Sequence, residues 1–304
     1  MISTTPLDLH WTGHPRSIAT ALLRSGKINA LIDPGPESTL STLREQLSAH
    51  RLAISEIHFI YLTHIHLDHA GATGSLLKEN PAIQVYVHSR GAKHMADPIV
   101  LLQSARRLYG DKMDILFGEF LPVPEKNLHR LDGGETLPLG DTELQVIYTP
   151  GHASHHVTYL EPSDATAFVG DTAGICIEGH PLVLPATPPP DIDLDLWKAS
   201  LQAIEALKPR RLFLTHFGYS DRPNQHLASY GIRLQLWNDI AARVLSAGLG
   251  EAEAMQEFAR QASAEAEKLV APEEIQHYRY NAQLPLSWLG LKRYHQKNAA
   301  KSST

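Results

Sequence analysis

Four side chains that can bind a metal ion lie within residues 64–69 of this 304-residue chain: His64, His66, Asp68 and His69. The mostly apolar stretch Ile57–Leu62 precedes them and predicts a buried strand, so the cluster is expected where a strand ends and a loop begins. Imidazole and carboxylate groups suit zinc, iron or manganese when they converge on one point. The pattern therefore predicts a metal site.

The same arrangement, an apolar stretch that ends in His or Asp beside a turn, occurs four more times. These further candidate residues are Asp33 after Leu31–Ile32, His152 after Leu144–Tyr148, Asp171 after Phe168–Gly170, and His216 after Leu212–Leu214. Five such strand ends in one chain are hard to attribute to chance, and they indicate side chains that gather at one site.

Two kinds of apolar pattern along the sequence predict the strands and helices that must position these residues. Period-2 and continuous apolar stretches predict strands, and apolar residues at i, i+3 and i+4 predict helices. We expect strands over Leu7–Trp11, Ser17–Leu23, Ile28–Ile32, Ile83–Val87 and Arg211–Leu214, a strand-rich region over Leu128–Val169, and helices over Glu37–His50, Pro98–Leu108 and Asp193–Leu207. In the last helix, Leu196, Leu201, Ile204 and Leu207 are expected to form the apolar face.

The composition changes after about Asp221, where two amphipathic helices are predicted around Trp237 and Phe258. The apolar stretch Tyr278–Tyr294 is expected to pack back onto the rest of the protein, and Asn298–Thr304 is expected to be disordered. We therefore predict two parts, residues 1–221 with the candidate ligands and residues 222–304 as a helical extension.

Composition excludes several classes of partner. The net charge is −6 and the chain has no basic run, which disfavours nucleic acid. No apolar stretch approaches the ~20 residues that a membrane helix needs. Cys176 is the single cysteine, so no internal disulfide can form, and a cytoplasmic protein without a signal peptide is expected. A small-molecule substrate fits these limits best, and the apolar C-terminal part makes a homodimer a further expectation.

The ordered set of motifs resembles the metallo-β-lactamase-fold superfamily, and within it the glyoxalase II-like hydrolases and lactonases. The pattern His-x-His-x-Asp-His matches His64 to His69, and the later motifs match His152, Asp171 and His216 in the same order. This resemblance covers roughly Ile28–His216. It implies an α/β (α+β) fold, a four-layer αβ/βα sandwich, to which the C-terminal helices add a cap.

The resemblance also implies two divalent metal ions, with zinc favoured and manganese or iron as alternatives. His64, His66 and His152 would hold the first ion, Asp68, His69 and His216 the second, and Asp171 would bridge them. Asp68 and Asp171 would then take part directly in catalysis. A metal-bridging hydroxide would attack the carbonyl carbon of a small ester, lactone or thioester, so no serine or cysteine nucleophile is required.

Some residues keep two interpretations. Asp33 either orients a ligand without touching the metal or only forms a turn. His156 matches the last histidine of the family's Gly-His-Thr-Pro-Gly-His pattern, although the Thr-Pro-Gly centre is absent here, and it is assigned the same orienting role. Asp68 is a ligand or the N-cap of a helix over Ala70–Lys78. Cys176 is expected to be a buried structural thiol.

Two departures from glyoxalase II disfavour S-lactoylglutathione as substrate. The glycine-rich stretch that follows Gly-Asp-Thr in that enzyme is replaced here by Ala173–Gly179. Arg293 and Lys297 have the spacing of its glutathione-binding basic residues, but their surroundings do not match. The residues that select the substrate are expected in the C-terminal helical region.

Three rival functions remain open. A mononuclear-iron persulfide dioxygenase of the same superfamily would bind one iron on a His-His-Asp set, so metal count and identity would distinguish it. A phosphodiesterase or nuclease is disfavoured by the acidic balance of the chain. A catalytically silent metal-binding protein would have no need of all seven ligands.

Overall fold

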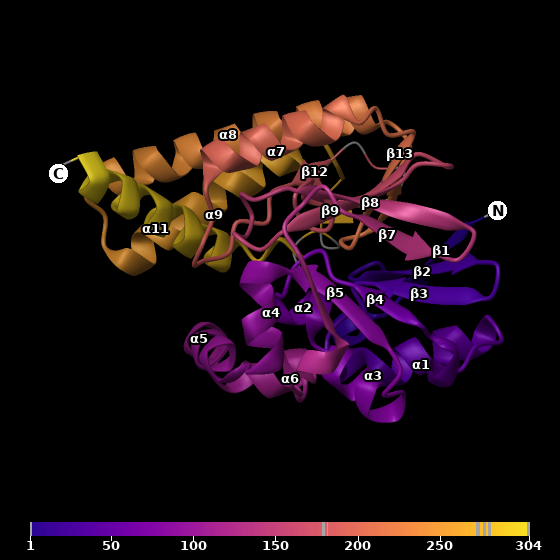
Figure 1. Ribbon diagram of the computed structural model, residues 1–304. Coiled ribbons are helices and arrows are strands. Elements are labelled where there is room, and N and C mark those ends of the chain that lie inside the picture. Colours follow the sequence, from indigo (N-terminus) through magenta and orange to yellow (C-terminus); the bar gives the residue numbers. More distant parts are fainter. Residues whose placement is uncertain are drawn as a thin grey trace.

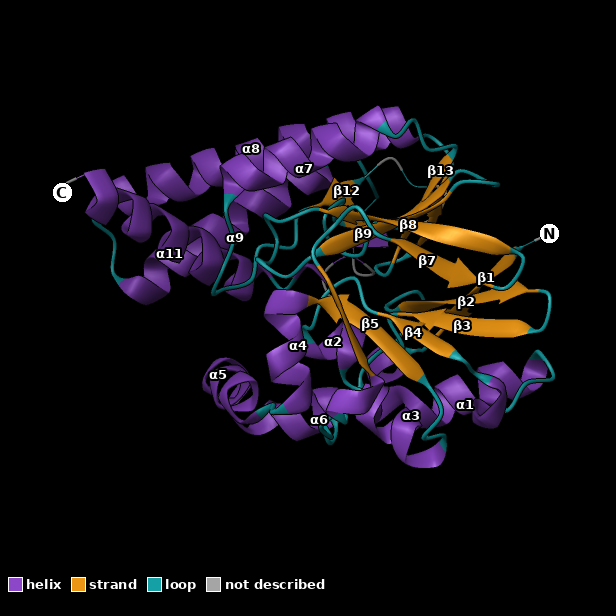
Figure 2. Cartoon of the chain, in the orientation of Figure 1, coloured by secondary structure: helices purple, strands orange, loops and turns teal. Residues whose placement is uncertain are grey.

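The computed structural model describes residues 2–177, 180, 182–271, 274–275, 278 and 281–302, and in them two six-stranded sheets lie face to face (Figures 1 and 2). The first sheet follows chain order: β1 (Ser3–Asp8), β2 (Ala19–Ser25), β3 (Ile28–Ile32), β4 (Phe59–Tyr61), β5 (Gln84–His88) and β6 (Leu128–Leu131). The second has the order β14 (Gly218–Ser220), β13 (Arg211–Leu214), β10 (Thr166–Phe168), β9 (Val157–Glu161), β8 (Thr142–Tyr148) and β7 (Thr136–Leu139). A small ribbon joins β11 (Ile175–Cys176) to β12 (Val183–Leu184).

Helices cover the outer face of each sheet (Figure 2). Those of the first sheet are α1 (Leu40–Ala49), α2 (Leu67–Ala70), α3 (Thr73–Glu79), α4 (Ser89–Ala96), α5 (Ile99–Tyr109) and α6 (Met113–Phe117). Those of the second are α7 (Leu194–Ala206), α8 (Pro223–Ser246), α9 (Glu251–Glu267) and α11 (Leu284–Ser302). The result is the expected four-layer αβ/βα sandwich with C-terminal helices.

Three apolar cores hold the four layers together, and side-chain alternation in the strands assigns residues to them. In β2, Ala21 and Leu23 face the second sheet, whereas Leu22 faces the helices of the first. Because both faces of such central strands are covered, the strands are apolar almost throughout. The third core joins the second sheet to α7, α8, α9 and α11.

Strand direction explains why the candidate ligands meet. In the first sheet β3, β4 and β5 are parallel. In the second sheet β8 and β10 are both antiparallel to β9, and β13 is parallel to β10, so β8, β10 and β13 run the same way. The carboxyl ends of β3 and β4 therefore share one edge of their sheet, and those of β8, β10 and β13 share one edge of the other.

The predicted strand Leu7–Trp11 is wrong in its position, because β1 ends at Asp8. The Asp8 carboxylate accepts hydrogen bonds from the backbone N–H groups of His10 and Arg16, and His10 has a positive φ of 49°. This local turn stops the strand. Trp11 then begins a short 3-10 helix, and its indole N–H donates to the carbonyl oxygen of Leu116.

The helix predicted over Asp193–Leu207 is confirmed, with Asp193 as N-cap, but its buried face is shifted. Leu196 is 47% exposed, whereas Trp197, Leu201 and Ile204 are buried. Residues 197, 201 and 204 follow the i, i+4, i+7 spacing of one helical face, and residue 196 lies about 100° away from residue 197 around the axis.

The helices of the C-terminal region pack against the second sheet as expected. Trp237, Phe258, Trp288 and Leu291 are buried in the same core as Leu212 of β13. Residues 279–280 of the stretch expected to pack back lie outside the described residues. The predicted disorder from Asn298 is wrong as far as Ser302, since α11 continues to that residue. The division of the chain at residue 221 stays a prediction.

Among the described residues, no helix is both long enough and apolar enough to cross a membrane.

Candidate metal centre

Four of the five strand ends bring seven candidate ligands to one edge of the sandwich, and the fifth, after β3, brings Asp33 beside them. His64 follows β4, His152 follows β8, Asp171 follows β10 and His216 follows β13. The remaining three, His66, Asp68 and His69, lie at the start of α2, which turns directly out of the strand end. All of them are buried apart from His66 and Asp68, which are partly exposed.

The first group of convergent atoms belongs to His64, His66, His152 and Asp171, and each residue offers one atom within 4.8 Å of the others. Nδ1 of His66 lies 3.0 Å from Nε2 of His64 and 2.9 Å from Nε2 of His152. Nε2 of His152 lies 3.4 Å from Oδ2 of Asp171. Three imidazoles and a carboxylate therefore face one point.

The second group consists of Asp68, His69 and His216. Oδ2 of Asp68 lies 3.3 Å from Nε2 of His216 and 3.9 Å from Nε2 of His69. Oδ1 of Asp171 lies 3.2 Å from Nε2 of His69 and 3.7 Å from Nε2 of His216. Asp171 thus turns one carboxylate oxygen toward each group.

The chemistry of these atoms fits a bound cation. Nε2 of His69 and Oδ1 of Asp171 are buried and close together, but neither makes a hydrogen bond within the described structure. Leaving such atoms unpaired in the interior is costly, and a divalent ion would use the lone pairs of both. Nitrogen and carboxylate oxygen donors in this number match zinc, manganese or iron.

Backbone and carboxylate acceptors select the tautomers of three histidines. Nδ1 of His152 donates to the carbonyl oxygen of Ala186 (2.9 Å), and Nδ1 of His216 donates to that of Ser17 (2.8 Å). Nδ1 of His69 lies 2.8 Å from Oδ2 of Asp33. A proton held on Nδ1 leaves Nε2 with its lone pair directed into the site, as a metal ligand requires.

Asp33 joins three strand ends. Its Oδ1 accepts from the backbone N–H of Thr63 (2.8 Å), and its Oδ2 accepts from the hydroxyls of Thr63 (2.6 Å) and Thr215 (2.9 Å) as well as from His69. Asp33, His64 and His69 also form a convergent set. Because hydrogen bonds already occupy both Asp33 oxygens, we assign this residue to orienting His69.

His156 lies behind the first group. Its ring stacks on His64 with centroids 4.9 Å apart, and its Nε2 accepts a hydrogen bond from the Asp171 backbone N–H (3.3 Å). Nδ1 lies 3.1 Å from the hydroxyls of Thr149 and Thr172. These contacts support the loop that carries Asp171, so His156 has the geometry of an orienting residue.

Two glycines permit the close approach of these loops. A Cβ at Gly170 (φ +48°) would lie 2.5 Å from Oγ1 of Thr63 and 2.6 Å from Nε2 of His156. A Cβ at Gly151 (φ +141°) would lie 2.3 Å from Cα of Trp197. A side chain at either position would push a ligand-bearing loop out of place.

Asp68 does not cap a helix over Ala70–Lys78, so that interpretation is wrong. Helix α2 begins at Leu67 with His66 as N-cap, and α3 begins separately at Thr73 with Ala72 as N-cap. Asp68 lies in the first turn of α2, where its carboxylate is free to face His216.

Burial and mutual contact set the charges in the site. Burial lowers the pKa of His66 to about 3 and that of His64 well below its ordinary value, so both rings are neutral near pH 7. Burial acts against the charge of His69 too, but Asp171, Asp68 and Asp33 raise its pKa well above the ordinary value. Although burial opposes ionisation of Asp171, His69, His216 and His152 hold its pKa well below the usual range.

Sequence reasoning did not identify Thr63 and Thr215, which bind Asp33. The available signal was the dipeptide Thr-His, which occurs at both strand ends, Thr63–His64 and Thr215–His216. Trp197 was expected neither in the core nor near the site, yet its indole N–H donates to the carbonyl oxygen of Thr172 (2.7 Å) and its ring packs edge-on to His152. No local sequence pattern predicts that the carbonyl oxygens of Ser17 and Ala186 accept hydrogen bonds from His216 and His152.

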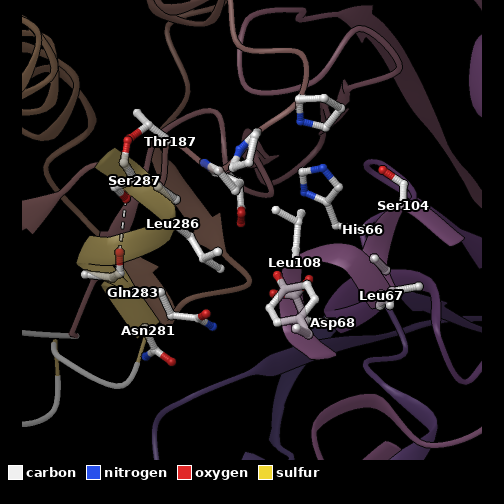
Figure 3. A pocket seen from close by; sticks show the side chains of 18 of the residues that line it. His66, Leu67, Asp68, Ser104, Leu108, Thr187, Asn281, Gln283, Leu286 and Ser287 are labelled. Atoms are coloured by element: carbon white, nitrogen blue, oxygen red, sulfur yellow. Dashed lines mark hydrogen bonds between the residues drawn. The ribbon is translucent and has the colours of Figure 1, made fainter. Parts of the chain in front are cut away.

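A cavity of about 100 Å³ opens beside the centre. Figure 3 shows His66 and Asp68 on one side of it and Asn281, Gln283, Leu286 and Ser287 on the other. Helix α5 contributes a further wall through Leu101, Ala105 and Leu108. Four of the candidate ligands, His66, Asp68, Asp171 and His216, thus line a pocket to which helices of both outer layers contribute.

A fold of two stacked sheets with a His/Asp cluster at their edge defines a class of metallohydrolases. The family model described as "Metallo-beta-lactamase superfamily" matches residues 14–216. The chain therefore belongs to the metallo-beta-lactamase superfamily. The predicted resemblance and fold class are confirmed.

Individual relatives agree with this assignment. A metallo-beta-lactamase fold-containing protein of Sulfurisphaera tokodaii is 32% identical over 205 residues, 66% of this chain and 73% of that protein. A protein of Emericella nidulans named as a thioesterase is 27% identical over 62% of this chain and 42% of its own length. A hydroxyacylglutathione hydrolase of Thermosynechococcus vestitus is 28% identical over 50% of this chain and 48% of its own. The chain thus matches less than half of these last two proteins.

Solved structures show the same fold over nearly the whole chain. A metallo-beta-lactamase family protein of Thermus thermophilus superposes with a TM-score of 0.72 at 19% identity, covering 98% of this chain and 94% of that one. The archaeal superfamily protein from Sulfolobus tokodaii superposes with a TM-score of 0.63 at 24% identity, covering 96% and 98%.

Proposed function

We propose that this protein is a dinuclear metal-dependent hydrolase that cleaves a small ester, lactone or thioester. The observation that carries the proposal is the position of Asp171, whose two carboxylate oxygens face two separate groups of ligand atoms. An anionic group between two dications offsets their repulsion. Relatives named as a thioesterase and as hydroxyacylglutathione hydrolases support the choice of an acyl substrate.

His64, His66, His152 and Asp171 would hold one ion, and Asp68, His69, His216 and Asp171 the other. When bound, such ions polarise a carbonyl and supply an activated water near neutral pH. The protein's own residues orient the imidazoles through Asp33, Ala186 and Ser17. Tyr109 and Asp68 both line the cavity, and we assign the Tyr109 hydroxyl as a candidate donor to a substrate oxygen.

A thiol nucleophile does not fit this site. Burial raises the pKa of the Cys176 thiol to about 12, so the thiolate is scarce at neutral pH. Cys176 is 5% exposed and is absent from the described lining of the cavity beside the ligands, as its interpretation as a structural thiol requires.

Metal analysis of the purified protein tests the proposal. We expect close to two zinc, manganese or iron ions per chain by plasma mass spectrometry, together with hydrolysis of members of an ester, lactone and thioester panel. One iron per chain, with oxygen uptake on a persulfide and no hydrolysis, would replace the proposal by the persulfide dioxygenase. Failure to retain any metal after reconstitution would refute both.

A further inference from the structure

The cavity beside the ligands has a distinctive chemical division. Its ligand end is polar, with Asp68, Asp171, His66 and His216. Away from these residues the described walls have apolar side chains, with Leu101, Ala105 and Leu108 on α5, Ala282 and Leu286 in the C-terminal region, and Pro188–Pro190. Between them lie the neutral polar side chains of Ser104, Thr187, Asn281, Gln283 and Ser287. None of the described lining residues is lysine or arginine.

From this division we infer that the cavity accepts an uncharged, apolar acyl chain of medium length, with its carbonyl at the ligand end. This inference rests on the proposed function and names its substrate class. A chain that carried a carboxylate or phosphate at its far end would lose hydration there and meet no described cation in return. A methyl-terminated chain would instead gain from burial against leucine and proline.

The size of the cavity supports a chain of several carbons. A single water-sized group needs roughly 10–15 Å³ of cavity space, and the cavity has about 100 Å³. The walls come from helices that are far apart in the sequence, with Leu108 on α5 and Leu286 on α11 (Figure 3). Ala105 is the one buried residue of α5. Leu101 and Leu108 line the cavity and are only partly buried, so part of their apolar surface is left for a ligand to cover.

The test compares aryl esters of one phenol that differ only in the acyl group. We expect kcat/KM to rise by roughly tenfold or more from acetyl to hexanoyl, because each buried methylene contributes. The adipoyl monoester has the same chain length with a terminal carboxylate, and we expect its kcat/KM to be roughly tenfold or more below that of the hexanoyl ester. Equal or better turnover of the adipoyl ester would overturn the inference.

A matched pair of variants on α5 tests whether the cavity wall at Leu101 selects the acyl chain. Leu101→Arg places a cation on the cavity wall, and we expect it to lower kcat/KM for the hexanoyl ester and raise it for the adipoyl ester. Ile99→Arg adds the same charge two residues away, at a side chain that is 60% exposed and does not line the cavity. We expect Ile99→Arg to change kcat/KM for neither the hexanoyl nor the adipoyl ester. Equal effects of the two variants would contradict the assignment of Leu101 to the cavity wall.

A binding measurement separates this inference from the proposed function. Saturation-transfer NMR with chelator-treated protein should detect hexanamide more strongly than acetamide, and Leu101→Arg should weaken the hexanamide signal. If no ester is hydrolysed but this preference is found, the hydrolase proposal fails and the apolar pocket stands. If esters are hydrolysed without any preference for the longer neutral chain, the pocket inference alone fails.

Discussion

Oδ2 of Asp33 lies 2.8 Å from Nδ1 of His69, and neither side chain is exposed to solvent. The two residues are 36 positions apart: Asp33 directly follows β3, and His69 lies in α2. The contact holds the proton of His69 on Nδ1 and turns Nε2 toward Asp68 and Asp171. One buried carboxylate thereby sets the orientation of a candidate ligand of the second group.

Replacing Asp33 by asparagine should weaken the second metal position selectively. The amide loses the negative charge, and its oxygen cannot satisfy all four donors that the carboxylate accepts. We expect a roughly 10- to 100-fold loss of affinity for one ion per chain, measured by titration with a competing chelator. Asp164→Asn is the control, because Asp164 pairs with Arg210 and Arg211 before β10, at the opposite end of that strand from Asp171. A variant with two ions bound as tightly as in the wild type would refute the orienting role.

Asp171→Asn should affect both groups at once. Asparagine preserves the volume of the side chain but removes the anion that lies between the two sets of imidazoles. We expect bound metal to fall below two ions per chain and kcat/KM for a cleaved ester to fall by roughly 100-fold or more. Elemental analysis and initial rates on the same sample check this. Full activity with two ions bound would refute the bridging role of Asp171.

Cys176→Ser should leave hydrolysis unchanged within about twofold. The Cys176 thiol is buried and its sulfur lies 3.6 Å from the carbonyl oxygens of Ile177 and His180, so the substitution exchanges one weak donor for a stronger one. Burying the hydroxyl should change the free energy of unfolding by about 1 kcal/mol at most. Urea unfolding and steady-state kinetics provide the two readings. A loss of hydrolysis with intact metal content would show that the Cys176 thiol is needed for the reaction.

His226 should make the protein sensitive to acid. Burial lowers its pKa from 6.5 to about 4, against the opposing effect of its hydrogen bond to the Ala173 carbonyl. The unfolded chain therefore binds more protons between these two pH values, and stability that is complete above pH 6.5 declines as the pH falls toward 4. The titration of His226 alone lowers the free energy of unfolding by at most roughly 3 kcal/mol over this pH range.

His226→Gln removes this titration while keeping a donor near Ala173. We expect the variant to lose less stability than the wild type between pH 6.5 and 4, compared by urea unfolding of chelator-treated protein so that metal release does not contribute. Both proteins contain the other buried histidines, and only the difference between them reports on His226. Identical acid slopes would show that its pKa is not depressed in the folded state.

Much of this site could be predicted because strand ends are local features. Asp33, His64, His152, Asp171 and His216 each follow an apolar stretch whose periodicity specifies a strand, and the sheet topology then brings those ends together. Side-chain type and spacing were sufficient to propose ligands.

Other features depend on which faces meet after folding. Leu196 matched a helical period, yet only packing against the second sheet decided that the face of Trp197 is the buried one. The turn at Asp8 ended β1 because the Asp8 carboxylate accepts hydrogen bonds from the backbone N–H groups of His10 and Arg16, which an apolar pattern does not encode.

Amino-acid types and their order along this chain determined the fold class and the candidate ligands, since period-2 alternation and the His/Asp clusters are properties of short segments. Tertiary structure alone decided how those ligands are held and what lies beside them. The backbone carbonyl oxygens of Ser17 and Ala186 accept hydrogen bonds from two of these histidines, and any residue type offers such an oxygen. The residue types at these positions therefore do not predict the two contacts. Leu108 and Leu286 become neighbours of one cavity only because packing brings together helices that are far apart in the sequence.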